Sequence, residues 1–145
     1  MKNMKLFLAG MLLSLFAISA FAQQDSLPMD QAISSSMSTL LMRLPEQTKV
    51  AILNFTAPNA AVSDYIIEEL IAFIVNNSTH TVVDRQNLET LQREMNFQLS
   101  GEVDDTTAQS IGKKVGANTI VSGSLTPLGK GYRLRLRAIN VETAE

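Results

Sequence analysis

The chain has 145 residues, a formal net charge of −2 and no cysteine. This length is enough for one domain with a substantial core but not for two. The absence of thiols excludes cysteine catalysis, thiolate metal sites and a lipid anchor on an N-terminal cysteine. The acidic balance argues against nucleic-acid binding, because phosphate contacts need a basic face.

The first 22 residues have the composition of a cleavable secretory signal. Lys2 and Lys5 give a positive start, and an apolar run over 6–17 follows. This run is too short to span a bilayer, which takes about 20 apolar residues. Small side chains then occupy the two positions that a signal peptidase reads. The predicted cleavage site consists of Ala20, Ala22 and Gln23.

Cleavage after Ala22 would leave 123 residues with 10 basic and 14 acidic side chains, a net charge of −4. We therefore expect an exported periplasmic protein whose mature form has no membrane-spanning segment. Because the new N-terminal residue would be Gln23 and not a cysteine, we do not expect a lipoprotein.

The mature chain is predicted to begin with a linker over 23–29 and to continue as a single domain over 30–145. Asp30 is predicted to cap a first helix that ends before Pro45. Apolar side chains recur in it at helical spacing, and serines occupy the opposite side. The predicted buried residues are Ile33, Met37, Leu40, Leu41 and Leu44.

Residues 49–55 form a short apolar run, typical of a strand that is covered on both faces of a sheet. Ser63 is predicted to cap a second helix that ends at Asn76 and Asn77. Residues 79–83 are rich in β-branched side chains and are predicted to form a second strand. The predicted apolar face of the second helix contains Val62, Tyr65, Ile66, Leu70, Phe73 and Ile74.

Two further helices are expected in the second half of the chain. Asp84 is predicted to cap the third, and Asp104 or Asp105 the fourth. Gly112 would let the fourth helix approach its neighbour closely, and Gly116 would end it in the left-handed conformation. The predicted buried residues of these helices are Leu88, Leu91 and Met95, and then Ala108, Ile111 and Val115.

Residues 119–125 and 132–141 are predicted to be strands, joined as a hairpin by a turn over 126–131. The resulting order, α-β-α-β-α-α-β-β, predicts an α/β fold with a mixed sheet of about four strands, in which the hairpin adds an antiparallel edge. Because the last strand lies so near Glu145, we expect the natural domain to continue beyond this residue.

The sequence contains no recognisable catalytic or cofactor motif, and we predict a protein that is not an enzyme and needs no cofactor or metal. His80 is the only histidine, so a histidine pair is not available. Asp104-Asp105 could be a metal clamp, but helix capping accounts for this pair better. Ser122-Gly123-Ser124 lies inside a predicted strand and not in a nucleophile elbow. Gly129-Lys130-Gly131 opens no helix, unlike a phosphate-binding loop.

Three arginines alternate along the last predicted strand and therefore project from one face of the sheet. Two interpretations remain open. The arginines could be solvated or form ion pairs with acids such as Glu102 or Glu142. They could instead form a contact surface for an anionic partner, either a protein or an acidic envelope polymer. The candidate contact residues are Arg133, Arg135, Arg137 and, in the preceding turn, Lys130.

Four stretches of the chain together resemble a known bacterial envelope family. They contain the segments VVDR (82–85), LSGEV (99–103), IGKKVGA (111–117) and VSGSL (121–125), and a similar strand precedes them at 49–55. Their order and spacing are similar to those of the CsgG-like curli-secretion components and the related LpoB-type activators of penicillin-binding proteins. The resemblance extends over residues 48–143.

This resemblance implies a periplasmic α/β domain that works by binding other envelope proteins, such as a peptidoglycan synthase, and brings no catalytic residues. A soluble component of an outer-membrane curli-type secretion complex is the alternative, and a homo-oligomer is compatible with either. Family members of both branches are lipoproteins, whereas this chain has no cysteine. We also find no pair of strands suited to cross an outer membrane, which favours the activator-like role.

Overall fold

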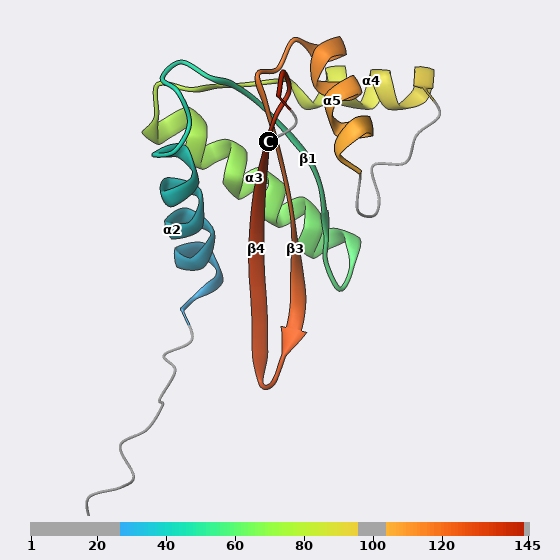
Figure 1. Cartoon of the computed structure of the whole chain (residues 1–145). Helices are drawn as coiled ribbons and strands as arrows, with labels where there is room; N and C mark the ends of the chain where they lie inside the picture. The colour runs from blue at the N-terminus through green and yellow to red at the C-terminus, as the bar shows by residue number, and fades with distance from the viewer. Residues whose placement is uncertain (1–26, 96–103, 144–145) are drawn as a thin grey trace, which may run out of the picture.

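The computed structural model describes residues 27–95 and 104–143 (Figure 1). The predicted signal with its cleavage site, and the segment 96–103 with its predicted turn at Gly101, lie outside the described residues. Helices and strands follow one another in the predicted order. They are α2 (Met29–Leu41), β1 (Lys49–Thr56), α3 (Ala60–Asn77), β2 (Thr81–Val82), α4 (Arg85–Met95), α5 (Asp105–Val115), β3 (Thr119–Leu128) and β4 (Gly131–Asn140).

The four strands form one mixed sheet in the order β2-β1-β3-β4. β1 lies parallel to β2 and to β3, whereas β3 and β4 are antiparallel neighbours. The predicted α/β fold with a mixed sheet and an antiparallel edge is therefore confirmed. In this order β4 lies at one edge of the sheet and β1 in its interior.

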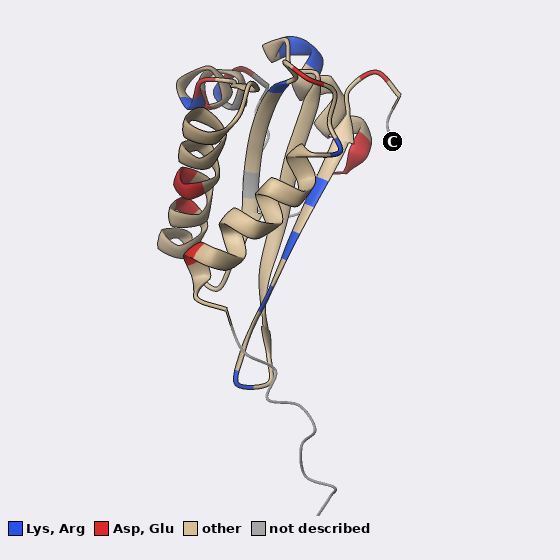
Figure 2. Ribbon diagram, turned by 90° about the vertical axis from the view of Figure 1, so that its left-hand side faces the viewer, with Lys and Arg blue, Asp and Glu red and all other residues tan. Residues whose placement is uncertain are grey.

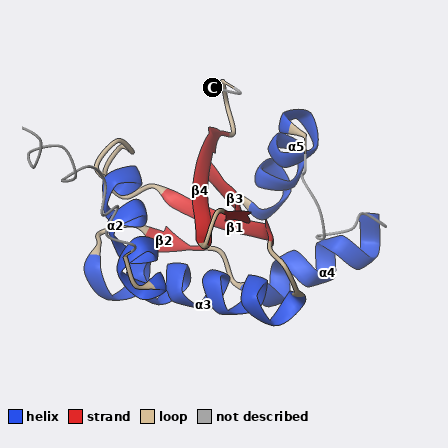
Figure 3. Ribbon diagram, turned by 90° about the horizontal axis from the view of Figure 1, so that it is seen from below, coloured by secondary structure: helices blue, strands red, loops and turns tan. Residues whose placement is uncertain are grey.

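Helices cover both faces of the sheet (Figure 3). α2 and α3 pack on one face and α4 and α5 on the other, and each pair encloses its own apolar core. β1 contributes to both cores, with Val50 and Ile52 on one side and Ala51 and Leu53 on the other. This arrangement confirms the prediction that the first strand is covered on both faces. No helix within the described ranges is long and apolar enough to span a membrane.

The predicted apolar faces of the helices are largely confirmed. Ile33, Met37 and Leu41 of α2 are buried, and the same holds for Ile66, Leu70 and Ile74 of α3. Tyr65 is the exception, because its side chain is exposed on α3. The neighbouring Ile67 is buried in its place.

The start of α2 differs from the prediction. The helix begins at Met29 after Pro28, so Asp30 lies inside the first turn and does not cap it. Proline suits this position, since its missing amide would have no partner within the helix. The Asp30 carboxylate instead accepts a hydrogen bond from the hydroxyl of Tyr65 and so connects α2 to α3.

The start of α3 also differs. Asn59 caps the helix, because its side chain accepts a hydrogen bond from the amide of Val62 at 3.0 Å. The predicted cap, Ser63, lies one turn further along. Its hydroxyl donates to the carbonyl of Phe55 at 2.8 Å and holds the helix against the end of β1.

The caps that the sequence places on α4 and α5 are confirmed. The Asp84 carboxylate accepts a hydrogen bond from the amide of Gln86 at 2.8 Å. Of the two candidates for α5, Asp104 is the cap, and it accepts from the amide of Thr107 at 3.0 Å. Gly116 ends α5 with a φ of 66°. A methyl group at Gly112 would collide with the side chain of Val141, as expected for a close approach.

β2 is shorter than predicted and contains only Thr81 and Val82. The residues before it connect α3 to the strand, and Ser78 closes the end of the helix. The Ser78 hydroxyl donates to the carbonyl of Ile74 at 2.8 Å and accepts from the amide of His80 at 3.2 Å. His80 therefore lies just outside the strand.

The hairpin is longer and its turn is tighter than predicted. β3 and β4 pair without interruption from Thr119↔Asn140 to Leu128↔Gly131, so the turn is Gly129-Lys130 and not 126–131. Gly129 has a φ of 59°, which two-residue hairpin turns commonly require. Figure 1 shows that the far half of this hairpin extends beyond the helices.

Candidate binding surface on the β3–β4 hairpin

The three arginines of β4 lie on the face of the sheet that α4 and α5 partly cover. Each is opposite a hydroxyl residue of β3, in the pairs Arg133–Thr126, Arg135–Ser124 and Arg137–Ser122. All three arginines are exposed, while Leu134 and Leu136 between them are half-buried against the α2–α3 core. The predicted alternation is therefore confirmed. Figure 2 shows basic positions recurring along this edge strand.

One of the arginines is held by a carboxylate. Nη1 of Arg137 lies 2.9 Å from Oδ1 of Asp105, in the first turn of α5. Glu102 and Glu142 were the expected partners, and Glu102 lies outside the described residues. Asp105 takes this role because α5 packs directly against the base of the hairpin.

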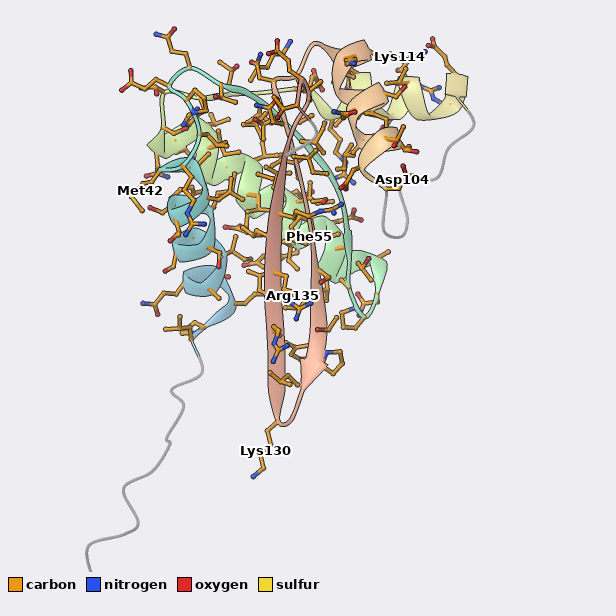
Figure 4. All side chains as sticks on the ribbon, viewed as in Figure 1. Met42, Phe55, Asp104, Lys114, Lys130 and Arg135 are labelled. Carbon is orange, nitrogen blue, oxygen red and sulfur yellow. The ribbon has the colours of Figure 1, made fainter. Side chains whose placement is uncertain are left out.

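The other two arginines have no carboxylate within 4.0 Å in the part of the chain that the structure describes. Arg133 and Arg135 lie further along the hairpin than Arg137, beyond the N-terminus of α5. Figure 4 shows Arg135 midway along β4 and Lys130 at the tip. The salt-bridge interpretation therefore holds for Arg137, and the described residues leave the charges of Arg133 and Arg135 to solvent.

The tip of the hairpin adds apolar surface to this positive charge. Tyr132 is 58% exposed and Leu128 is 51% exposed, and Lys130 is also exposed. Amphipathic side chains of this kind are enriched where proteins bind one another. Lys130 lies in the turn that precedes the arginine strand, as the sequence predicts.

An open depression runs along β4 and was not predicted. On one side it is bordered by the polar face of α2 and the turn that follows, with Ser35, Thr39 and Arg43. On the other side it reaches Arg135 and Arg137 of β4 and the hydroxyls of Ser122 and Ser124. The serines of α2 are visible in the sequence as the helix's polar side, but no local signal indicates that they face a strand about 100 residues away.

Some of the remaining candidate residues have structural roles, and the geometry defines no role for the others. The side-chain and backbone hydrogen bonds from Thr107 to the Asp104 carboxylate lower the pKa of Asp104, as expected of a helix cap. No group of three or more histidine, cysteine or acidic residues among the described residues could hold a metal ion. Nδ1 of His80 is buried without a hydrogen-bond partner among these residues. Ser122-Gly123-Ser124 lies inside β3, as predicted.

Comparison with solved structures finds the same fold. The LpoB C-terminal domain from Salmonella enterica superposes with a TM-score of 0.66 at 18% identity, over 78% of this chain and 87% of that one. The LpoB C-terminal domain from Escherichia coli gives 0.66 and 18%, over 80% and 90%. The solution structure of Escherichia coli LpoB gives 0.65 and 16%, over 88% and 72%.

Comparison of sequences gives the family. No match to this chain was found among curated proteins. The family model for the curli production assembly/transport component CsgG matches residues 21–135, which is most of the chain. The resemblance seen in the short segments of the sequence is therefore confirmed, and this chain belongs to the CsgG family, with the fold of the LpoB C-terminal domain.

Proposed function

We propose that this protein is a non-enzymatic periplasmic interaction protein that assists cell-envelope assembly by binding another envelope protein through its β3–β4 hairpin. The resemblance to LpoB-type activators suggests a peptidoglycan synthase as the partner. The signal-like N-terminal segment supports export, and the acidic mature chain fits a protein partner better than a nucleic acid.

The observation that carries this proposal is the unbalanced charge of the hairpin. Arg133 and Arg135 lie nearer the tip of the hairpin than Arg137 and have no carboxylate partner among the described residues. Their neighbours across the sheet, Thr126 and Ser124, are neutral. Exposed arginines beside an accessible tyrosine are typical of the residues that dominate protein–protein interfaces.

Site-specific photo-crosslinking in the periplasm tests this proposal. A photo-reactive side chain at Arg135 should capture a partner protein, whereas the same group at Val75, which is exposed on α3, should not. N-terminal sequencing of the exported protein should give Gln23 as the first residue. Recovery of the mature protein as an uncrosslinked monomer from both positions, or of the intact Met1 form from the cytosol, would overturn the proposal.

A second function is supported by the description of the matching family model. As a curli production assembly/transport component, the protein would be a soluble part of an outer-membrane secretion complex. Sedimentation with outer membranes after a salt wash, in an assembly of several copies, would favour this role. Recovery in the soluble periplasmic fraction after the same wash would favour the first proposal.

A further inference from the structure

We infer that the outer edge of β4 binds an extended acidic segment of the partner protein, which adds to the sheet as a fifth strand. This inference rests on the proposed function, that the hairpin binds an envelope protein, and specifies the chemistry of the bound segment. It predicts glutamate or aspartate at alternate positions of that segment and apolar residues between them.

The first step is that β4 has a free edge. It pairs with β3 alone along its whole length, and no other strand of the described chain lies beside it. An edge strand exposes every second pair of backbone amide and carbonyl groups, which can form hydrogen bonds with another extended chain. Binding of this kind obtains its affinity from the backbone and its specificity from alternate side chains.

The second step is that the edge is accessible from both faces of the sheet. The depression along β4 is lined by residues of alternate orientation, with Leu134, Leu136 and Ala138 on one face and Arg135 and Arg137 on the other. Open space on both sides of a strand is what an added strand needs, because its own side chains also alternate between the faces.

The third step is the charge of this depression. Three arginines line it, Arg43, Arg135 and Arg137, and the residues that line it include no carboxylate. Arg137 is paired with Asp105, which leaves Arg43 and Arg135 as the arginines of the depression without a carboxylate partner among the described residues. Successive arginines of β4 are two residues apart, a distance of about 7 Å along a strand. Acidic side chains at the same period in an added strand would lie directly opposite them, where opposite charges stabilise and like charges destabilise the pairing.

The same rule disfavours a second copy of this chain as the occupant. If two β4 strands paired edge to edge in antiparallel orientation, centred on Arg135, Arg133 of one copy would lie opposite Arg137 of the other. The three central cross-strand pairs on this face would then be arginine with arginine, which is unfavourable. An acidic strand from another protein has the opposite sign at each of these positions.

The apolar face of β4 defines the rest of the bound segment. Leu134 and Leu136 are half-buried there, and Leu40 and Leu44, at and just after the end of α2, are half-buried beside the same core. Side chains that alternate with the acidic ones would point toward this face. Valine or isoleucine would suit these positions, since β-branched residues pack well in strands.

The probe for this inference is a peptide of alternating glutamate and valine, long enough to match β4 from residue 132 to residue 138. It should bind the mature protein and shift the NMR amide signals of β4 more than those of β2, the opposite edge. The matched control is the same peptide with alternate backbone amides N-methylated, which removes edge hydrogen bonds without changing charge. The control should bind at least about tenfold more weakly.

Charge reversal supplies the second control. Arg133→Glu with Arg135→Glu should weaken binding of the glutamate–valine peptide by about tenfold or more and create binding of a lysine–valine peptide. Both positions are exposed, so the variant should fold, and its circular dichroism spectrum checks this.

The outcomes separate the two proposals. Equal binding of the N-methylated peptide, or full competition by polyphosphate, would show that the surface attracts polyanions without strand addition and would overturn the inference. A crosslinked partner at Arg135 together with that result would leave the proposed function intact. Failure of the peptide to bind at all would also overturn the inference, whereas absence of any crosslinked partner would overturn the proposed function.

Discussion

Arg137 on β4 and Asp105 on α5 form an ion pair of 2.9 Å that connects the last strand to the first turn of a helix on the arginine face of the sheet. Both side chains are about half exposed, at 45% and 51%, so solvent screens the attraction. The position of Asp105 adds a second favourable contact, because the N-terminus of a helix attracts negative charge. Arg137 is thus the arginine of β4 whose charge is balanced by a carboxylate of the same domain.

Arg137→Gln should therefore lower the free energy of unfolding by less than about 1 kcal/mol, and the loss should shrink at high salt. Urea denaturation at low and high ionic strength measures it. Arg135→Gln is the matched control on the same strand and should leave stability unchanged. An equal loss for both variants would show that the arginines stabilise the sheet in some other way.

Gly123→Ala should destabilise the domain strongly. A methyl group at this position would collide with the carbonyl of Arg135 on β4 and with the ring of Phe55, which lies over the glycine from β1. Overpacking of this kind typically costs about 1–3 kcal/mol, and a backbone carbonyl cannot move aside as a side chain can. The control is Gly131→Ala, where nothing lies within 4 Å of the added methyl group. Equal melting temperatures for both variants would contradict this account.

The stability of the domain should fall in acid because the Asp104 carboxylate becomes protonated. Its pKa is lowered from 3.8 by the hydrogen bonds from Thr107, so the folded state holds the carboxylate more strongly than the unfolded state does. The resulting stabilisation is present above pH 3.8 and is lost as the pH falls through the lower pKa of the folded state. Asp104→Ser keeps a capping oxygen but cannot titrate. Thermal melts across this range should show a shallower acid slope for the variant, and identical slopes would count against the cap as the cause.

The hydroxyl of Tyr65 should ionise at a higher pH than that of an ordinary tyrosine. Its hydrogen bond to the Asp30 carboxylate raises its pKa from 10.0 to about 12, because ionisation would place two negative charges together. The contact therefore contributes stability below pH 10.0 that is lost as the pH rises through about 12. In a Tyr132→Phe background, ultraviolet absorbance follows Tyr65 alone. Asp30→Ala should bring the midpoint back toward 10.0, and an unchanged midpoint would exclude Asp30 as the cause.

The order of the elements could be predicted because apolar periodicity reports which side of each element is buried. The first residue of each helix could be predicted less precisely, since several residues near it are able to cap the helix. Asp104 was one of two neighbouring candidates for α5 and proved to be the cap, whereas α3 is capped by Asn59, four residues before the predicted Ser63. The Ser63 hydroxyl forms a hydrogen bond to β1 instead, which explains why this serine does not cap α3.

The arginine face could be predicted from the strand period alone, since alternate residues project to the same side. Its partners could not. Asp105 reaches Arg137 only because α5 packs beside β4, and the depression exists only because α2 borders the same strand from the other face. Such contacts join residues far apart in the sequence, and no local pattern encodes them.

The double role of β1 links the two halves of the domain thermodynamically. Val50 and Ala51 are adjacent in the chain, yet each is buried in a different apolar core. Neither helix pair can detach without exposing one face of the strand that supports the other. Melting should therefore be a single cooperative transition, and amide hydrogens in both helix layers should exchange with the same free energy of opening.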